Sequence, residues 1–370
     1  MRIPRLLEAR LTDSSQPLDE SWKRLPVARR GKTLLGISFR PRQVEGFGLD
    51  PPATLSALLS FPYELIRLAA YWNHMELRTG ALDTGELDWQ LEAAERAGKH
   101  VIVCVGAVKN FGYPEFFVPG HHLERPLDEG SLVRPSTHPD LLSAARRFVG
   151  QIVRRYQGRP SIVAWQLEHE AVDPLGMEHS WRLGVDFVRA ELDAIKEADP
   201  SRPVLMNGFL PTSSVVRLSQ WWRTRGQGDS LAVAAEMADI VGVDYYPRHA
   251  LLGLGRRTVY LDGADLPWQR AHTDTTLRTI RNKGKRVMVS EGQAEPWEAV
   301  TKPPNPEMRA MFSCSPSEII RNYNAAMGWS GDEAPLYAYL FWGAEYWILR
   351  SRSGDPSYLQ AFERILNEGG

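Results

Sequence analysis

Two short segments of this chain end in carboxylates, and together they hold the residue types needed to cleave a glycosidic bond. Residues 162–167 form a strand-like run that leads into Glu168, His169 and Glu170, and residues 287–291 form a second run that ends in Glu291. Each run has the length and composition of a buried β-strand. Two carboxyl groups on either side of a sugar can act as proton donor and as nucleophile. The pair therefore predicts chemistry on a glycoside, provided that the fold brings the two strand ends together.

Eight short runs of apolar or β-branched residues recur along the chain, and they are the elements that must position the two glutamates. Most are bounded by glycine, proline or charged residues, and each is too short for an isolated helix. Their alternation with amphipathic stretches predicts parallel strands joined by helices. The runs cover residues 34–39, 64–70, 100–105, 162–167, 203–207, 239–244, 286–290 and 336–342.

Helical periodicity is clearest at residues 141–156 and at residues 181–192, where apolar side chains recur every three or four positions. A capping box at residues 315–318 predicts a helix start, Gly98 fits a left-handed cap after a helix, and Pro200 marks a helix end. The eight alternations of strand and helix predict an α/β fold, a single (β/α)8 TIM barrel. An open doubly wound sheet is the main rival architecture.

The size and composition of the chain fit this architecture. Its 370 residues, 43% of them hydrophobic, suit either one barrel or two ordinary domains, but no linker or internal repeat divides them. Residues 1–30 carry many charges and little periodicity. We interpret them as an N-terminal extension that wraps the barrel bottom or is partly disordered, and residues 31–370 as the catalytic barrel.

The charge balance favours a neutral partner. The 44 basic and 45 acidic residues give a net charge of -1, so no global field favours nucleic acid or an anionic membrane. The start of the chain has no sustained apolar stretch, and no segment reaches membrane-spanning length. We therefore expect a cytoplasmic protein, or a secreted one if its start is processed, that acts on carbohydrate. Cys104 and Cys314 are not expected to form a disulfide. The sequence gives no indication of the oligomeric state.

In a (β/α)8 barrel the active site lies at the C-terminal ends of the strands, so the residues that close each run are the candidate site residues. Many of them are polar or aromatic, as a sugar site requires. Besides Glu170 and Glu291, the candidates for substrate binding are Arg67, Trp72, Asn73, His169, Asn207, Tyr246, Trp297, Trp342 and Glu345.

This ordered set resembles the large clan of retaining glycoside hydrolases that includes cellulases and β-galactosidases. In that clan the acid/base closes the fourth barrel strand and the nucleophile closes the seventh, as Glu170 and Glu291 do here. Arg67, Tyr246 and Trp342 match further positions of the clan, and the resemblance covers residues 34–347. Segments that look like β-galactosidase-type members lie at residues 67–73, 80–83, 87–88 and 112–117.

The resemblance implies a retaining β-glycosidase that needs no cofactor or metal. Its implied substrates are β-galactosides, β-glucosides or β-mannosides. The long loop at residues 108–135 favours attack at a chain end, and attack within a chain stays open. Two residues depart from the clan pattern: His169 stands where many members have asparagine before the acid/base, and Asp244 stands where many have asparagine or histidine. Both departures affect the identity of the sugar more than the reaction.

The chemistry sets requirements for the two glutamates. A nucleophilic carboxylate must stay ionised, so a buried Glu291 needs donors, and Arg67 and the hydroxyl of Tyr246 are available. Glu170 must instead hold a proton near neutral pH, which burial and nearby negative charge would favour. We expect Glu168, which alternation places on the same face, to lie deeper as a partner of Arg67 or another cation.

Several residues compete with these assignments. Glu295, after the seventh run, is a weaker candidate nucleophile and is expected to bind substrate or order its loop. Trp72, Trp297 and Trp342 are expected to stack on sugar rings, whereas Trp89 and Trp181 sit in helical patterns and are expected in the core.

Other classes of function remain open from the sequence. The chain could be a carbohydrate-binding barrel without turnover, a transglycosylase, or a metal-dependent hydrolase that uses His74, His121 and His122. The metal hypothesis is weak because adjacent histidines are expected to point in different directions. No dinucleotide fingerprint and no P-loop is present, so no nucleotide cofactor is expected.

Overall fold

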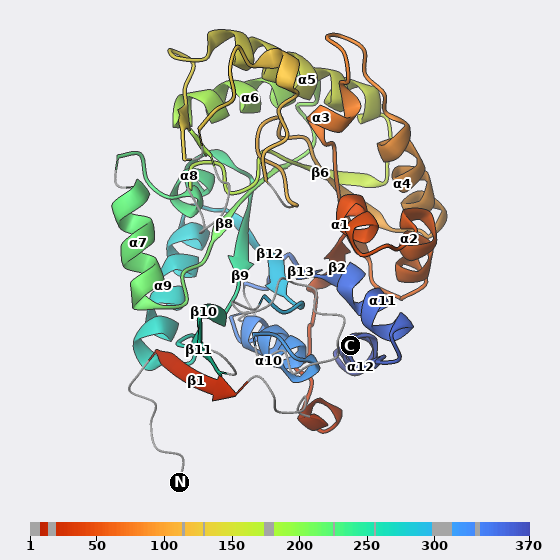
Figure 1. The fold of residues 1–370 in the computed structure, drawn as a ribbon, viewed down its shortest axis with the longest axis vertical. Helices are drawn as coiled ribbons and strands as arrows, with labels where there is room; N and C mark the ends of the chain where they lie inside the picture. The colour runs from red at the N-terminus through yellow and green to blue at the C-terminus, as the bar shows by residue number, and fades with distance from the viewer. Residues whose placement is uncertain are drawn as a thin grey trace.

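Eight parallel strands close into a barrel in the computed structural model (Figure 1). The structure describes residues 8–13, 20–112, 115–128, 130–173, 181–224, 226–254, 257–297, 313–329 and 334–370. Each predicted run overlaps one barrel strand, which confirms the predicted fold. The strands are β2 (Leu34–Ser38), β3 (Leu65–Ala69), β4 (His100–Cys104), β6 (Ile162–Gln166), β8 (Val204–Phe209), β9 (Ile240–Tyr245), β12 (Arg286–Gln293) and β13 (Ala338–Trp342).

Helices surround the barrel and connect its strands (Figure 1). They are α1 (Pro41–Gly46), α2 (Pro51–Leu59), α3 (Trp72–Met75), α4 (Gly85–Arg96), α5 (Pro139–Tyr156), α6 (Val185–Ala198), α7 (Ser214–Thr224), α8 (Ser230–Met237), α9 (Pro267–Asn282), α10 (Pro316–Met327), α11 (Ala344–Arg352) and α12 (Ser357–Glu368), with short 3-10 helices η1 (Glu20–Lys23) and η2 (Gly120–His122). Among the described residues, no helix is long and apolar enough to cross a membrane.

Helix boundaries follow the sequence signals in three cases and depart from them in one. Gly98 has the predicted positive φ of 67° after α4, α10 begins at Pro316, and α6 ends at Ala198 before Pro200. The prediction that Trp181 belongs to a helix was wrong. Residues 181–183 are extended instead, because β7 (Arg182–Leu183) pairs with β5 (Leu132–Val133) before α6 begins.

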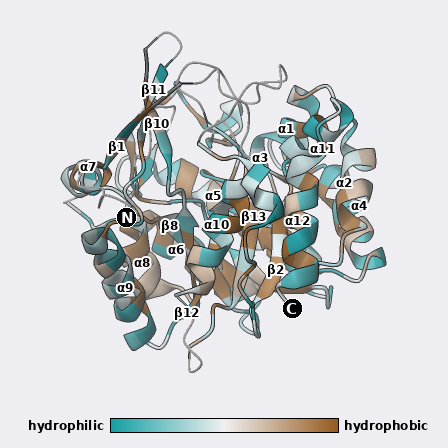
Figure 2. Cartoon of the chain, turned by 90° about the horizontal axis from the view of Figure 1, so that it is seen from below, coloured by the Kyte–Doolittle hydropathy of each residue, from teal (hydrophilic) through white to brown (hydrophobic). Residues whose placement is uncertain are grey.

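An apolar layer fills the middle of the barrel and a polar layer lies above it. The apolar layer includes Leu65, Ala164 and Leu205 from three strands. Side chains two positions further along a strand share its face, so each of these strands next presents a polar residue toward the C-terminal end. A second, larger core lies between strands and helices, and Figure 2 shows hydrophobic residues concentrated there.

A β-bulge in β12 gives the seventh strand two consecutive inward side chains. The pairing of β12 with β9 slips between Val289 and Glu291, so that one extra residue, Ser290, is inserted opposite β9. Bulges re-aim side chains and are frequent next to functional sites. Here the bulge allows both Ser290 and Glu291 to reach groups inside the barrel mouth.

The N-terminal segment contacts the barrel region at two places, through residues 9–13 and through Ala28. β1 (Ala9–Asp13) pairs with β11 (Arg257–Leu261), which pairs in turn with β10 (His249–Leu254), the strand that follows β9. Further on, the backbone N–H of Ala28 donates to Asn324 Oδ1 of α10 at 2.8 Å. Residues 1–7 and 14–19 of the predicted extension lie outside the described residues, so its boundary stays a prediction.

Candidate active site

Glu291 lies at the barrel mouth with a hydrogen-bond donor on each carboxylate oxygen. Arg67 Nη2 donates to Oε1 at 2.6 Å, and the Tyr246 hydroxyl donates to Oε2 at 2.6 Å. The guanidinium of Arg67 is fixed in turn by Ser38 Oγ at 2.9 Å and by Gln166 Oε1 at 3.3 Å. These are the two donors expected from the sequence. An arginine and a hydroxyl therefore fix the orientation of this buried carboxylate.

The ion pair between Arg67 and Glu291 yields a stability prediction, because the two side chains are only 0% and 4% exposed. The variant Arg67→Met should lower the free energy of unfolding by about 3–5 kcal/mol, since it leaves a buried charge without its partner. The double variant Arg67→Met/Glu291→Gln should recover most of that loss. Urea denaturation of the wild type and of these two variants measures both effects. A loss below about 1 kcal/mol in the single variant would contradict the prediction.

Glu170 follows β6 in a backbone conformation that is unusual for a side-chain-bearing residue. Glu168 and Glu170 have φ values of 51° and 44°, in the left-handed region. A Cβ at Gly106 would lie 2.3 Å from the Glu168 nitrogen, so only glycine permits this close approach. The turn holds the residues between two packed strands and directs Glu170 into the barrel mouth.

Negative neighbours surround the buried carboxyl group of Glu170. Burial and the charges of Asp244, Glu115 and Glu291 raise the pKa of Glu170 well above its usual range. Burial and the charge of Glu291 likewise raise the pKa of Asp244. Asp244 accepts from Asn207 Nδ2 at 2.6 Å and from Ser290 Oγ at 2.7 Å. The environment of Glu170 therefore favours its protonated form.

Asn207 of β8 orders the residues around Glu170 with all four of its hydrogen-bonding sites. Its Nδ2 contacts His169 Nδ1 at 2.8 Å as well as Asp244. Its Oδ1 accepts from Gln166 Nε2 at 3.1 Å and from the Glu170 backbone N–H at 3.3 Å. The side chain predicted to bind substrate is thus fully used by the protein, and its role in the structure is to position its neighbours.

His169 is held as a neutral imidazole. Burial and the nearby cations of Arg67 and Lys109 lower the pKa of His169 well below its usual value. Because Asn207 donates to Nδ1, the proton of the neutral ring sits on Nε2. His169 therefore presents one N–H donor at the site and does not change charge near neutral pH.

Glu168 does not contact Arg67, so that prediction was wrong. Its carboxylate instead accepts from the backbone N–H of Val108 at 2.9 Å and from that of Lys109. The left-handed φ breaks the strand alternation that the prediction assumed. Burial raises the pKa of Glu168 to about 7, and burial with the charge of Glu168 raises the pKa of Glu191 further. Glu168 therefore stabilises the loop after β4 by accepting its backbone N–H groups.

Arg40 clamps two of the other candidate carboxylates. Its Nη1 and Nη2 donate to Glu295 at 2.9 and 3.0 Å, and Nη2 also donates to Glu345 at 2.8 Å. All three side chains are less than 5% exposed. Glu295 also approaches Gly343, whose φ of 113° requires glycine. Both glutamates are therefore bound to the same protein cation, Arg40.

The predicted aromatic residues occupy different environments. Trp342 lies in a cluster with Phe111 at the barrel mouth, with the Arg40 guanidinium 4.1 Å from its ring. Trp72 lies instead in the hydrophobic core, fully buried and stacked on Phe148 at 5.4 Å, because it starts helix α3 facing α5. This corrects the expectation that Trp72 stacks on a sugar. Trp89 packs against the core as expected.

Three candidate residues keep polar atoms without a protein partner among the described residues. These atoms are Asn73 Oδ1, Trp297 Nε1 and Trp342 Nε1, each buried. The backbone holds two of these side chains in place, because the N–H of Asn73 donates to Phe117 O at 2.8 Å and that of Trp297 to Ser313 Oγ at 2.7 Å. Such atoms are suited to bind ligand hydroxyls.

Sequence reasoning missed two charged residues after β4. Lys109 is fully buried, and its Nζ donates to the carbonyls of Glu170 at 2.7 Å and Asp173 at 3.0 Å. Glu115 Oε1 lies 3.8 Å from His169 Nε2, and burial raises the pKa of Glu115 to about 7. The loop between them has no periodicity, and its residues 113–114 lie outside the described residues, so only its position after a barrel strand was a signal.

Two of the three groups of close metal-ligand side chains in the described residues lie at this site. They are Glu115 with His169 and Glu170, and His169 with Asp244 and Glu291. Both groups share His169, whose Nδ1 already contacts Asn207. The oxygens of Asp244 and Glu291 also accept hydrogen bonds from protein donors, so these carboxylates are engaged by the protein itself.

No family model matches the chain, and no curated protein matches it. Solved structures do. A GH5_18 protein from Streptomyces cattleya in complex with GlcNAc has a TM-score of 0.57 at 14% identity, covering 92% of this chain and 82% of that one. An exo-β-1,4-mannosidase from an Opitutaceae bacterium gives 0.53 at 17%, covering 88% and 55%, and xylanase 10B from Thermotoga maritima gives 0.51 at 14%, covering 92% and 98%.

The chain shares the fold of glycoside hydrolases. This agrees with the resemblance inferred from the order of strand-end residues. At such low identities the likeness establishes the architecture alone, so the residues at the strand ends must carry the argument about activity.

Proposed function

We propose that this protein is a retaining β-glycosidase in which Glu170 is the acid/base and Glu291 the nucleophile. The observation that carries the proposal is the different setting of the two carboxyl groups. Both oxygens of Glu291 accept hydrogen bonds, from Arg67 and from Tyr246, which hold the carboxylate in place. Glu170 is buried among other carboxyl groups, and this raises its pKa well above the usual range, as a proton donor requires. A carboxylate held by two donors at the end of strand seven and an acid with a raised pKa at the end of strand four suit a nucleophile and an acid/base.

The first step forms a glycosyl-enzyme. Glu170 gives its proton to the glycosidic oxygen while a Glu291 oxygen attacks the anomeric carbon from the opposite face. The bond between that carbon and the leaving oxygen breaks, and the aglycone departs as an alcohol. Tyr246 and Arg67 position the carboxylate for attack. Glu170 is left ionised.

The second step returns both residues to their starting states. Glu170 accepts a proton from water, whose oxygen attacks the anomeric carbon and displaces Glu291. Two inversions give a product with the starting configuration. The neighbouring acids that raise the pKa of Glu170 also make it a competent base for this step.

The sugar is proposed from weaker evidence. The notable donor beside the acid is His169 Nε2–H, and Trp342 offers an aromatic face and a free Nε1. Two similar structures are described as an exo-β-1,4-mannosidase and as a complex with Manβ1-4GlcNAc. We therefore place β-mannosides before β-glucosides and β-galactosides, with attack at a chain end. The similar structures reported above include a mannosidase and a xylanase, so they give no specific support to the β-galactosidase-like expectation.

A panel of aryl β-glycosides with an activated leaving group tests the function and the sugar together. Release of the aryl group from at least one member, with retained configuration in the first-formed sugar by NMR, is the expected result. Inverted product would exclude the double displacement. Binding of sugars without release from any member would favour the alternative of a carbohydrate-binding barrel, which the departures at His169 and Asp244 motivate.

Two further alternatives are tested with the same panel. Transglycosylation would appear as transfer of the sugar to an added acceptor at the expense of free sugar. A metal-dependent hydrolase would lose its activity after a strong chelator and regain it with metal, whereas the two-glutamate reaction needs no metal ion.

The charge of Asp244 predicts a shift in the pH dependence of activity. After burial, this charge is the largest cause of the raised pKa of Glu170. The variant Asp244→Asn should therefore lower that pKa. Because Glu170 must be protonated to donate, activity falls as pH rises through its pKa, and the basic limb of kcat/KM should move to lower pH. A basic limb that stays in place or moves to higher pH would contradict the coupling of the two acids.

A further inference from the structure

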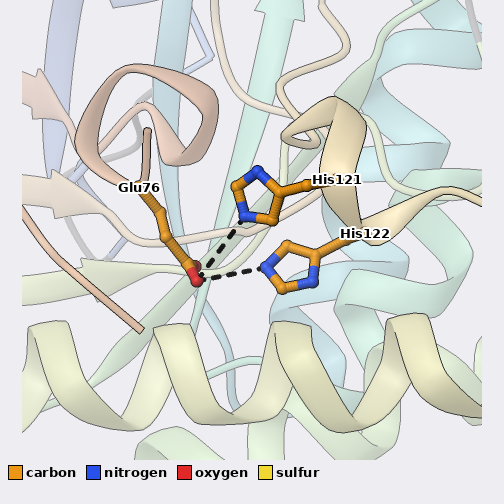
Figure 3. Close-up of side chains that lie close together, drawn as sticks. All are labelled: Glu76, His121 and His122. Carbon is orange, nitrogen blue, oxygen red and sulfur yellow. Dashed lines mark hydrogen bonds and ion pairs between the residues drawn. The ribbon is translucent and has the colours of Figure 1, made fainter. Parts of the chain in front are cut away.

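A third group of metal-ligand side chains lies apart from the proposed catalytic glutamates. Glu76 ends helix α3, whereas His121 and His122 form the 3-10 helix η2 after β4. Figure 3 shows both imidazole rings turned toward the carboxylate of Glu76. The Nε2 atoms of His121 and His122 lie 3.8 and 3.2 Å from Glu76 Oε1. Two chain segments about forty residues apart therefore meet at three nitrogen and oxygen ligands.

The spacing of these three atoms fits a tetrahedral metal ion. All three lie within 4.8 Å of one another. Ligands bound to zinc at about 2.0–2.2 Å with tetrahedral angles are separated by about 3.3–3.5 Å. The observed 3.2 and 3.8 Å bracket that separation. Small side-chain rotations would therefore place the three atoms on one ion.

Trp72 and Gly80 contact the proposed ligands and fix their orientation. Trp72 Nε1 donates to Glu76 Oε2 at 2.5 Å, and the backbone N–H of Gly80 donates to Oε1 at 2.7 Å. The Trp72 ring also stacks on His122, with centroids 4.8 Å apart. Hydrogen bonds to a ligating carboxylate and fixed ring planes are the usual second layer of such sites.

Burial and charge also suit a cation here. The Glu76 side chain is 4% exposed and that of His121 is 29% exposed, so the carboxylate is sheltered while one side stays open to solvent. The His122 side chain is 9% exposed, so two of the three ligands are largely sheltered from solvent. Two imidazoles and one carboxylate are a donor set typical of zinc.

We infer that Glu76, His121 and His122 bind one divalent transition-metal ion of the zinc class, with the fourth position open to water. The ion would tie the segment after β4 to the end of α3. The expectation that the adjacent histidines point in different directions was wrong, because on the 3-10 turn η2 the Nε2 atoms of His121 and His122 both approach Glu76 Oε1. This inference does not depend on the proposed glycosidase activity, since neither catalytic glutamate belongs to the site.

Metal binding to the intact chain tests the inference. Protein stripped with a chelator and then desalted is titrated with Zn²⁺ by calorimetry, and with Co²⁺ by visible absorption. We expect one ion per chain, the intense visible bands of tetrahedral Co²⁺, and a higher Tm in Zn²⁺ than in chelator. The variant His121→Ala removes the most exposed ligand and should weaken binding at least about tenfold.

A matched control separates this site from stray binding to surface histidines. His100 is exposed at the start of β4, at the opposite end of that strand, so His100→Ala should bind Zn²⁺ as the wild type does. Stoichiometric binding that survives His121→Ala, or no binding by the wild type at micromolar Zn²⁺, would overturn the inference. Either result would leave the three residues joined by hydrogen bonds alone. Because the readouts are affinity, absorption and Tm, inactivity toward glycosides does not affect the outcome.

Discussion

Replacing Glu291 with alanine is expected to lower kcat on an activated aryl β-glycoside by at least about 10⁴-fold, because it removes the carboxylate proposed to form the glycosyl intermediate. Added azide should restore part of the activity by occupying the vacated space. Its nitrogen would attack the anomeric carbon as the aryl oxide leaves, giving a glycosyl azide of inverted configuration. Aryl release and NMR of the product measure both effects.

The control for this prediction is Glu295, the competing carboxylate in the loop that follows strand β12. Glu295→Gln keeps the shape and a hydrogen bond to Arg40, so it should retain far more activity than Glu291→Ala and should not respond to azide. If Glu295→Gln were the variant rescued by azide, the nucleophile would be Glu295. Circular dichroism and Tm of each variant confirm that a loss of rate is not a loss of fold.

Replacing Glu170 with alanine is expected to affect poor substrates far more than good ones. A substrate with a basic leaving group needs the proton, so kcat/KM should fall by about 10²–10⁴-fold. An activated aryl glycoside leaves without that proton, so its first step should be nearly unchanged. The glycosyl-enzyme should then accumulate, which appears as a burst of aryl release before the slow second step.

Glu115 supplies the matched control, since burial also raises its pKa to about 7 and its carboxyl also approaches His169. Glu115→Gln should slow substrates with good and poor leaving groups to a similar extent. A selective loss on poor leaving groups in Glu115→Gln, with none in Glu170→Ala, would move the acid role to Glu115. Equal losses on both substrates in Glu170→Ala would leave that residue a positioning role only.

The sequence predicted the barrel and the partners of Glu291 because both follow from simple periodicity. Buried strands are continuous apolar runs, and a closed parallel sheet gathers their C-terminal ends at one mouth. Arg67 lies within strand two and Tyr246 follows strand six, and both match positions of the glycoside hydrolase clan, so both were expected to reach the end of strand seven. The donors on Glu291 are indeed these two residues.

The same reasoning failed where the backbone leaves its regular path. Alternation assigned Glu168 to Arg67, but a left-handed φ turned it toward the loop after β4. A bulge at Ser290, the saturated amide of Asn207 and the burial of Trp72 likewise depend on contacts between distant segments. The local sequence pattern does not specify which of several polar neighbours from distant segments a side chain will contact.

The left-handed backbone of Glu168 and Glu170 predicts a conflict between thermal stability and catalytic activity. Non-glycine residues in that region cost about 1–3 kcal/mol each, and the surrounding packing must hold them there. Laboratory evolution for thermal tolerance alone would favour glycine or asparagine at Glu168 and Glu170, which adopt such torsions readily. The replacement at Glu170 would remove the proposed proton donor. Variants selected for heat tolerance without an activity screen are therefore expected to include many that fold but are inactive, because Glu170 in this turn has been replaced.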